Sequence, residues 1–200
     1  MMQVDPNPDL ERLRQYVTGM HDLTAPEWAG LRTGWQIITV KRKTMLTAAG
    51  ETERYLYFVL EGVQRAFYLG ARNQDATLVF TYPPSFSGVA DSFLTRQPSN
   101  YFFETLTASR LMRMPYETVF QLMEQHPGIR AFVLNVTAQA LRGVLQRQVE
   151  IQCLNAEEKF KTLLQRSPHL LQLIPHKYIA SYLALDATTF SKLLGSVRIT

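Results

Sequence analysis

The longest regular hydrophobic pattern in the chain runs from residue 127 to residue 154, where apolar residues recur at spacings of three and four. That period indicates an α-helix, and no proline interrupts the segment after Pro127. At a rise of about 1.5 Å per residue, the helix is roughly 40 Å long. Its apolar side chains form two adjacent stripes. The first stripe consists of Val133, Val136, Ala140, Val144 and Ile151, and the second of Leu134, Ala138, Leu141, Leu145 and Val149.

The chain's own core covers one such stripe, and the second stripe indicates another partner. We predict a homodimer in which two copies of this helix pack about a two-fold axis. Ala140 and Gly143 allow a close approach, and Arg147 and Glu150 suit the exposed rim of the seam. The predicted interface comprises Val133, Val136, Ala140, Val144, Arg147 and Ile151. A central helix that a monomeric domain buries on all sides explains the same pattern, so that alternative stays open.

From Trp35 the pattern changes to short segments rich in β-branched and aromatic residues. These segments are WQIITVKRKTMLT, YLYFVLEG, VQRAFYLG, ATLVFTY, NYFFETLTA and SRLMRMP. Glycine or proline separates them at intervals of about 8 to 15 residues, which predicts strands joined by turns. We expect an antiparallel β sandwich or jelly roll of about eight strands, with residues 70–75 at a hairpin tip. Residues 8–33 predict two helices before the strands, and Pro115 precedes a short helix after them.

The chain beyond residue 154 is helical in pattern. Asn155 is a suitable cap for a first helix, and a helix from Lys177 to about Leu183 precedes another that begins near Asp186. Two short helices joined by a tight turn form a helix-turn-helix pattern, although an ordinary helical hairpin has the same pattern. We predict an α+β fold: an antiparallel β jelly roll with flanking helices, a long dimerisation helix and a C-terminal helix-turn-helix unit. The predicted domains are 1–154 and 155–200.

Charge favours the C-terminal unit as the place where a polyanion binds. The net charge of the chain is +4, and residues 155–200 hold six Lys or Arg against three Asp or Glu. A basic excess of this kind is typical of a weak nucleic-acid footprint and also of an ordinary solvated surface. The polar, acidic start and the absence of a long apolar run predict a folded cytoplasmic protein. Cys153, the single cysteine, cannot form an internal disulfide or a metal centre alone.

The sequence contains none of the common catalytic motifs. It has no HExxH, no glycine-rich phosphate loop and no GxSxG, so we predict that the protein is not an enzyme and has no catalytic residues. No Cys or His spacing suits a metal, and we predict no metal site and no cofactor. Asp91 and Glu104 are a pair of carboxylates of the kind usually found on a solvated surface.

The order of a β roll, a long helix and a helix-turn-helix resembles the Crp/Fnr family of bacterial transcription regulators. Gly50, Glu51, Tyr57 and Gly62 match the family's glycine-acidic turn and aromatic strand. The segment IPHKYIASYLALDATTFSKLL is similar to the compact DNA-binding end of members that lack the usual β wing. The resemblance implies a cytoplasmic homodimer with a cyclic-nucleotide-binding-like roll. It implies as partners double-stranded DNA, a second copy of the chain, RNA polymerase and an unknown small-molecule effector, and no membrane.

Phe86 and Gly88 resemble the aromatic residue and the glycine that open the family's phosphate-binding cassette. The rest of this cassette departs from the family pattern. In members that bind cyclic AMP, the cassette glycine is followed by a glutamate and, about eleven residues later, by an arginine-serine pair. Here Val89 follows Gly88, and Ser99-Asn100 stands at the pair. A buried phosphate without its arginine costs several kcal/mol, so we predict that cyclic AMP does not bind in the usual way. Arg96 either swings in from the same loop or stays on the surface. The candidate pocket comprises Phe86, Gly88, Val89, Arg96, Ser99 and Asn100.

The recognition helix departs as well. Family members that read a guanine usually carry an arginine, a glutamate and a second arginine where this chain has Ala187, Thr188 and Lys192. Fewer bidentate contacts, each worth about 1–3 kcal/mol, imply a weaker or different sequence preference. The predicted DNA-binding residues are Lys177, Tyr178, Ala187, Thr188, Thr189, Ser191 and Lys192. Two functions follow: a DNA-binding regulator, or a ligand-binding or protein-interaction module whose helix-turn-helix no longer reads DNA.

Overall fold

The computed structural model describes residues 7–71 and 74–196. Its centre is a β roll made of two antiparallel four-stranded sheets. The first sheet has the order β1 (Gln36–Val40), β8 (Ser109–Pro115), β3 (Tyr55–Glu61) and β6 (Ser85–Ser87). The second has the order β2 (Met45–Thr47), β7 (Phe102–Thr105), β4 (Gln64–Leu69) and β5 (Asp75–Thr81). The predicted jelly roll is confirmed, because alternating residues of both sheets meet in one core.

The core between the sheets is apolar and aromatic. It consists of the buried residues Tyr57, Val59, Val89, Phe103 and Leu111. The rings of Tyr57 and Phe103 lie 5.8 Å apart, and Val89 comes from the cassette loop rather than from a strand. Side chains from the cassette loop therefore belong to the packing of the roll.

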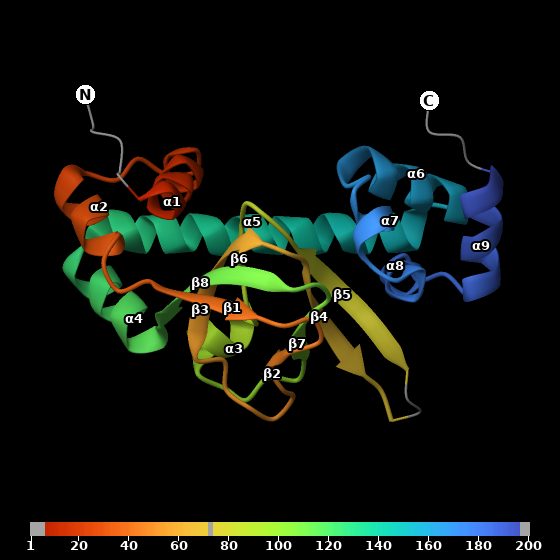
Figure 1. Cartoon of the computed structure of the whole chain (residues 1–200), viewed down its shortest axis with the longest axis horizontal. Helices are drawn as coiled ribbons and strands as arrows, with labels where there is room; N and C mark the ends of the chain where they lie inside the picture. Colours follow the sequence, from red (N-terminus) through yellow and green to blue (C-terminus); the bar gives the residue numbers. More distant parts are fainter. Residues whose placement is uncertain (1–6, 72–73, 197–200) are drawn as a thin grey trace.

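Helices gather at one end of the roll (Figure 1). They are α1 (Pro8–Thr18), α2 (Ala25–Leu31) and α4 (Tyr116–Gln125), as the sequence predicts. Asn7 caps α1, and Thr24 with Glu27 forms a capping box on α2. Glu27 also accepts a hydrogen bond from the Gly128 amide, at 2.7 Å, and so joins α2 to the start of the long helix. A fourth helix, α3 (Ala90–Thr95), lies in the cassette loop, where no helix was predicted.

The predicted long helix is a single element, α5 (Pro127–Cys153). It runs along the whole molecule, with α1, α2 and α4 at one end and the C-terminal helices at the other (Figure 1). Ile129 and Phe132 anchor its first turns in the core beneath α1 and α2, whereas most side chains beyond residue 133 are exposed. Within the described ranges, no helix is long and apolar enough to cross a membrane.

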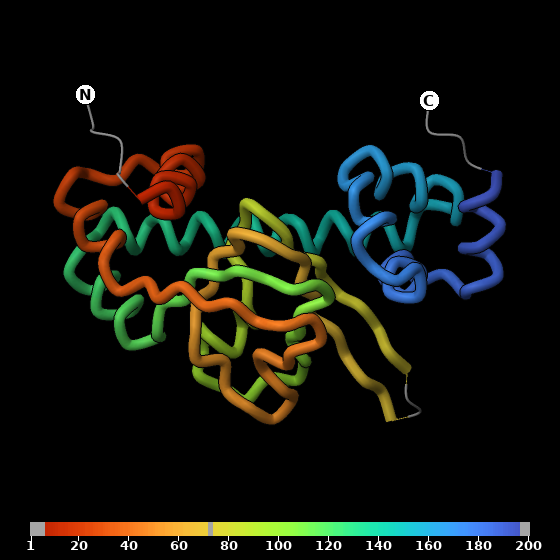
Figure 2. Tube along the Cα trace, in the orientation of Figure 1, coloured from red at the N-terminus to blue at the C-terminus, as the bar shows by residue number. Residues whose placement is uncertain are grey.

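The C-terminal unit contains α6 (Ala156–Arg166), α7 (Leu170–Leu173), α8 (His176–Tyr182) and α9 (Ala187–Ser196). Asn155 caps α6 with a capping box, as the sequence suggests. Helices α8 and α9 form the predicted pair, and α8 lies beside the β4–β5 hairpin (Figure 2). Phe160, Ile179 and Phe190 share one apolar cluster with Val63 and Leu106 of the roll. The division into 1–154 and 155–200 stays a prediction.

Candidate functional site

Helix α9 presents a polar face to solvent. Ala187, Thr188, Ser191 and Lys192 are exposed, while Phe190 on the opposite face is buried against the ring of Phe160. These four residues come from the predicted DNA-binding set, and the helical period brings them together on one side. This face therefore offers hydroxyl and ammonium groups beside a small apolar residue.

Thr189 has a local role at the start of α9. Its amide and its hydroxyl donate to the Asp186 carboxylate, at 2.9 and 2.6 Å. These hydrogen bonds, the hydroxyl first, lower the pKa of Asp186, so the carboxylate stays charged at the N-terminus of the helix. Thr189 thus fixes the first turn of α9 while its half-buried side chain is turned away from the exposed face.

The prediction that Tyr178 touches the DNA backbone is wrong. Tyr178 is only 7% exposed, because the Arg65 guanidinium of β4 lies 3.8 Å from its ring centroid. Lys177, the neighbouring residue, is exposed, and its ammonium group lies 4.9 Å from the same ring. At the start of α8, Lys177 is therefore accessible to a phosphate group, whereas Tyr178 is buried.

An apolar stripe runs along the free side of α5. Leu134 is 62% exposed, and the other members are more than half exposed. The stripe consists of Leu134, Leu141, Val144, Leu145 and Val149. Leu141, Leu145 and Val149 also line a shallow concavity of about 360 Å³. A helix that its own domain buries on all sides is therefore excluded.

This stripe corrects the residues predicted for the dimer interface. Val133 and Val136 pack against the chain's own core, and Ile151 is half-buried. Ala140 and Val144 are exposed as predicted. The sequence pattern was two stripes wide, and the second stripe remains uncovered together with Ala140 and Val144 of the first.

Arg147 and Glu150 were predicted to lie on the exposed rim of the seam, and this was wrong. Both are buried, and Arg147 donates to Glu150 at 3.1 Å and to the Tyr182 carbonyl oxygen. Arg166 of α6 donates to Glu150 at 3.0 Å. Burial acts to raise the pKa of Glu150, but the two arginines hold it below its ordinary value. The cluster joins the end of α5 to α6 and α8.

The cassette residues do not converge on one cavity. Phe86 packs among the rings of Tyr16, Phe58 and Phe132, in the core beneath the helices. Ser99 is buried in a turn and exchanges backbone hydrogen bonds with Gly50 and Glu51. The remaining positions differ from one another: Gly88 has a φ of +122°, Val89 is buried in the roll, and Asn100 is exposed.

A buried carboxylate that the sequence analysis missed lies beside this loop. Glu53 is 1% exposed, and its Oε2 accepts from the Thr47 hydroxyl at 2.7 Å and from the Val89 amide at 3.2 Å. Its Oε1 accepts from the amides of Arg54 and Tyr55, at 2.9 and 3.2 Å. Burial raises the pKa of Glu53 even though these donors act to lower it. Its polar neighbours made this position resemble an exposed turn.

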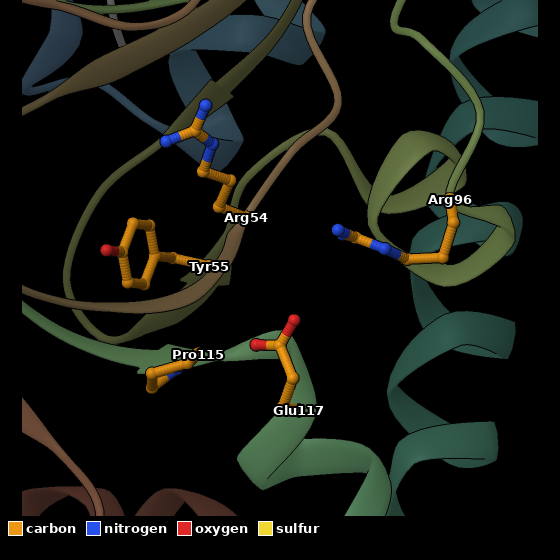
Figure 3. A pocket seen from close by; sticks show the side chains of 5 residues that line it. All are labelled: Arg54, Tyr55, Arg96, Pro115 and Glu117. Atoms are coloured by element: carbon orange, nitrogen blue, oxygen red, sulfur yellow. The ribbon is translucent and has the colours of Figure 1, made fainter.

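Arg96 stays on the outside of the roll. Its backbone is left-handed, with a φ of 59°, and its guanidinium donates to the Glu53 carbonyl oxygen at 2.6 Å. The same group lies 4.1 Å from the ring centroid of Tyr116. Arg96 and Glu117 face a pocket of about 260 Å³, as Figure 3 shows. The remaining lining residues are Arg54, Tyr55 and Pro115. Arg96 therefore does not swing into the roll in this structure.

Comparison with known proteins agrees with this architecture. Residues 37–126 match the model of the cyclic nucleotide-binding domain. The fumarate and nitrate reduction regulatory protein of Vibrio cholerae is 24% identical over 167 residues, which cover 78% of this chain. The chain spans 66% of the length of that relative.

Two solved structures show the same fold. FixK2 from Bradyrhizobium japonicum has a TM-score of 0.72 at 15% identity, over 80% of this chain and 83% of that one. A putative Crp/Fnr-family transcriptional regulator from Eubacterium rectale has a TM-score of 0.71 at 16% identity, over 90% and 88%. Residues 37–126 thus resemble a cyclic nucleotide-binding domain, and the chain has the fold of these two structures. The predicted resemblance to the Crp/Fnr family of transcription regulators is confirmed.

Proposed function

We propose that the protein is a DNA-binding transcription regulator that acts in the cytoplasm as a homodimer. The observation that carries this proposal is the exposed face of α9, formed by Ala187, Thr188, Ser191 and Lys192. The face lies at the end of the molecule that is farthest from α1 and α2 (Figure 1). Helices that read DNA enter the major groove with such a face, so α9 is the recognition helix.

The apolar stripe of α5 supports the homodimer. Large exposed apolar surface usually marks an interface, and a second copy of α5 brings a stripe of the same chemistry. Two copies joined in this way carry two recognition helices, which a regulator must space about 34 Å apart to reach successive major grooves. RNA polymerase is a further partner of such a regulator.

The cassette residues support the inference that the roll does not bind cyclic AMP in the usual way. Val89 and Ser99 stand where the sugar and phosphate contacts are expected, and both are buried within the protein's own packing. The Val89 amide already donates to the Glu53 carboxylate. A cyclic phosphate placed beside that carboxylate would meet a like charge without an arginine to compensate. The roll therefore acts as a scaffold or takes a ligand of different chemistry.

The direct test is binding to DNA at low salt. Sequences selected from a random duplex pool by the wild-type protein are used in fluorescence anisotropy. The double variant Lys177→Glu/Lys192→Glu should bind at least about tenfold more weakly, because two phosphate contacts become repulsive. Lys41→Glu/Lys43→Glu makes the same charge change in an exposed turn of the roll and should affect binding much less. A wild-type dimer that binds no duplex overturns the proposal.

A second function is favoured by the sparse charge of α9. In the part of this helix that the structure describes, Lys192 is the one basic residue. A ligand-binding or protein-interaction module whose helix-turn-helix no longer reads DNA fits that observation. Unchanged regulation in the host by Lys177→Glu/Lys192→Glu would favour this second function.

A further inference from the structure

A buried arginine lies between the roll and the helix-turn-helix unit. Arg65 of β4 is 3% exposed, and its Nε donates to Glu104 of β7 at 2.7 Å. Its two terminal nitrogens donate to the Asp75 carboxylate at 2.6 and 2.9 Å, and one also donates to Thr77 at 3.0 Å. Glu104, which the sequence suggested would be solvated, is buried in this cluster.

The Arg65 guanidinium is also enclosed by two aromatic rings. Phe67 of β4 and Tyr178 of α8 each have their ring centroid 3.8 Å from its central carbon. Phe67 belongs to the roll, whereas Tyr178 belongs to the first helix of the helix-turn-helix. A guanidinium is planar and forms bidentate pairs while its faces stack, which an ammonium group cannot do. One side chain therefore links three strands to α8.

A second polar contact lies beside it. The Ser181 hydroxyl of α8 donates to the Asp75 carbonyl oxygen at 2.7 Å and accepts from the Thr77 amide at 2.9 Å. Both partners are in β5, the strand that supplies Asp75 to the Arg65 cluster. Helix α8 is thus fixed to the hairpin in two directions, by stacking on Arg65 and by hydrogen bonds along β5.

We propose that Arg65 is a positioning residue that holds the helix-turn-helix unit against the β4–β5 hairpin and so fixes the direction in which α9 meets DNA. This inference rests on the proposed function. The chain leaves α5 at Leu154, whose backbone is extended, so the connection itself is not a continuous helix. Two recognition helices must keep one spacing and direction to fit successive grooves. A second anchor away from α5 supplies that rigidity.

The contact between α8 and the hairpin leaves the polar face of α9 exposed to solvent. Ala187, Thr188 and Lys192 are exposed while Tyr178 is buried under Arg65. The contact therefore orients α9 without covering it, and its loss should weaken DNA binding rather than relieve inhibition.

The position of the unit is measured directly, without DNA. In a Cys153→Ser background, spin labels at Arg42→Cys in the roll and Ser191→Cys in α9 report one distance within a chain, with an excess of unlabelled chain added. We expect a narrow distance distribution for the parent and a broad one for Arg65→Ala. Arg110→Ala is the matched control, because Arg110 also makes a bidentate pair, but with Asp9 of α1, at the end of the molecule opposite α8 (Figure 1). Its distribution should remain narrow.

Two variants of Tyr178 keep the test decisive if Arg65→Ala fails to fold. Tyr178→Ala removes the ring and leaves every ion pair of Arg65 in place, so it should also broaden the distribution. Tyr178→Phe retains the ring and should not. A narrow distribution in a folded Arg65→Ala or Tyr178→Ala protein overturns the inference.

The functional readout is binding to operators whose half-site spacing is varied. Arg65→Ala and Arg65→Lys should lower affinity for the preferred spacing at least about fivefold, the lower end of usual coupling between sites. They should also tolerate changed spacings better than the parent, which a general loss of stability would not produce. A broad distance distribution with unchanged affinity and spacing preference overturns the positioning role. A parent that binds no DNA overturns the proposed function, and the spin-label distances then decide separately whether Arg65 holds the unit.

Discussion

The cassette loop of the roll and the outward faces of α5 and α9 differ in where their side chains find partners. In the loop, Val89 packs into the core and Glu53 is surrounded by donors of its own chain. On α5 and α9, apolar and polar side chains of comparable size remain exposed. The side chains still available to other molecules therefore lie on these two helices, because the cassette-loop groups inside the roll already have partners in their own chain.

The largest effect should follow from removing the apolar stripe. Leu141→Glu/Leu145→Glu places two carboxylates in the proposed seam, where each unpaired charge costs several kcal/mol on burial. Self-association should weaken at least about a hundredfold, measured by sedimentation equilibrium. Leu173→Glu changes another exposed leucine, on α7, and should leave the dimer intact. A double variant that remains dimeric would place the interface elsewhere.

A smaller effect, on stability, should follow from removing the buried Glu53 carboxylate inside the roll. Glu53→Ala removes the acceptor of four hydrogen-bond donors, of which two, the Thr47 hydroxyl and the Val89 amide, are fully buried. The free energy of unfolding should fall by about 3 kcal/mol in urea titrations, since buried unsatisfied groups cost about 1–3 kcal/mol each. Glu124→Ala, at an exposed site of α4, should change it by less than about 0.5 kcal/mol. Equal effects in both variants would mean that Glu53 contributes no more than a surface residue.

The smallest effect should be a pH dependence that comes from Glu53. Because burial raises its pKa in the folded protein, its contribution to stability is full below the unfolded pKa of about 4.5 and is lost as the pH rises through the folded value. The stability of the wild type relative to Glu53→Gln should therefore decline from pH 4 towards neutrality. Tyr57 stays protonated throughout, since burial raises its pKa as well. A relative stability that rises with pH would contradict the direction of the shift.

Much of the fold could be predicted because its determinants are local. A 3.6-residue period identifies α5, alternation bounded by glycine identifies the strands, and the caps at Asn155 and Asp186 identify α6 and α9. Helix α3 was missed because six residues in a loop carry too little periodicity. The positions of helices and strands are thus determined mainly by residues that are close together in the sequence.

The partners of buried charges could not be predicted in the same way. Arg65 meets Asp75 and Glu104, which are 10 and 39 residues away in sequence. A charged or tyrosine side chain looks solvent-exposed in a sequence until the element that covers it is known. The exposed polar face of α9 was predicted, whereas the contacts between α8 and the β4–β5 hairpin were not.

The hydrogen bonds of Ser181 have a consequence for solubility. Strand β5 is an edge strand of its sheet, and an edge strand can pair with a strand from another molecule. Its exposed Leu78 and Val79 make that pairing more favourable. Because the Ser181 hydroxyl bonds the Asp75 carbonyl oxygen and the Thr77 amide of β5, the C-terminal helices protect this edge strand from pairing with another molecule. A chain shortened before α6 would lose that shield and become prone to aggregate.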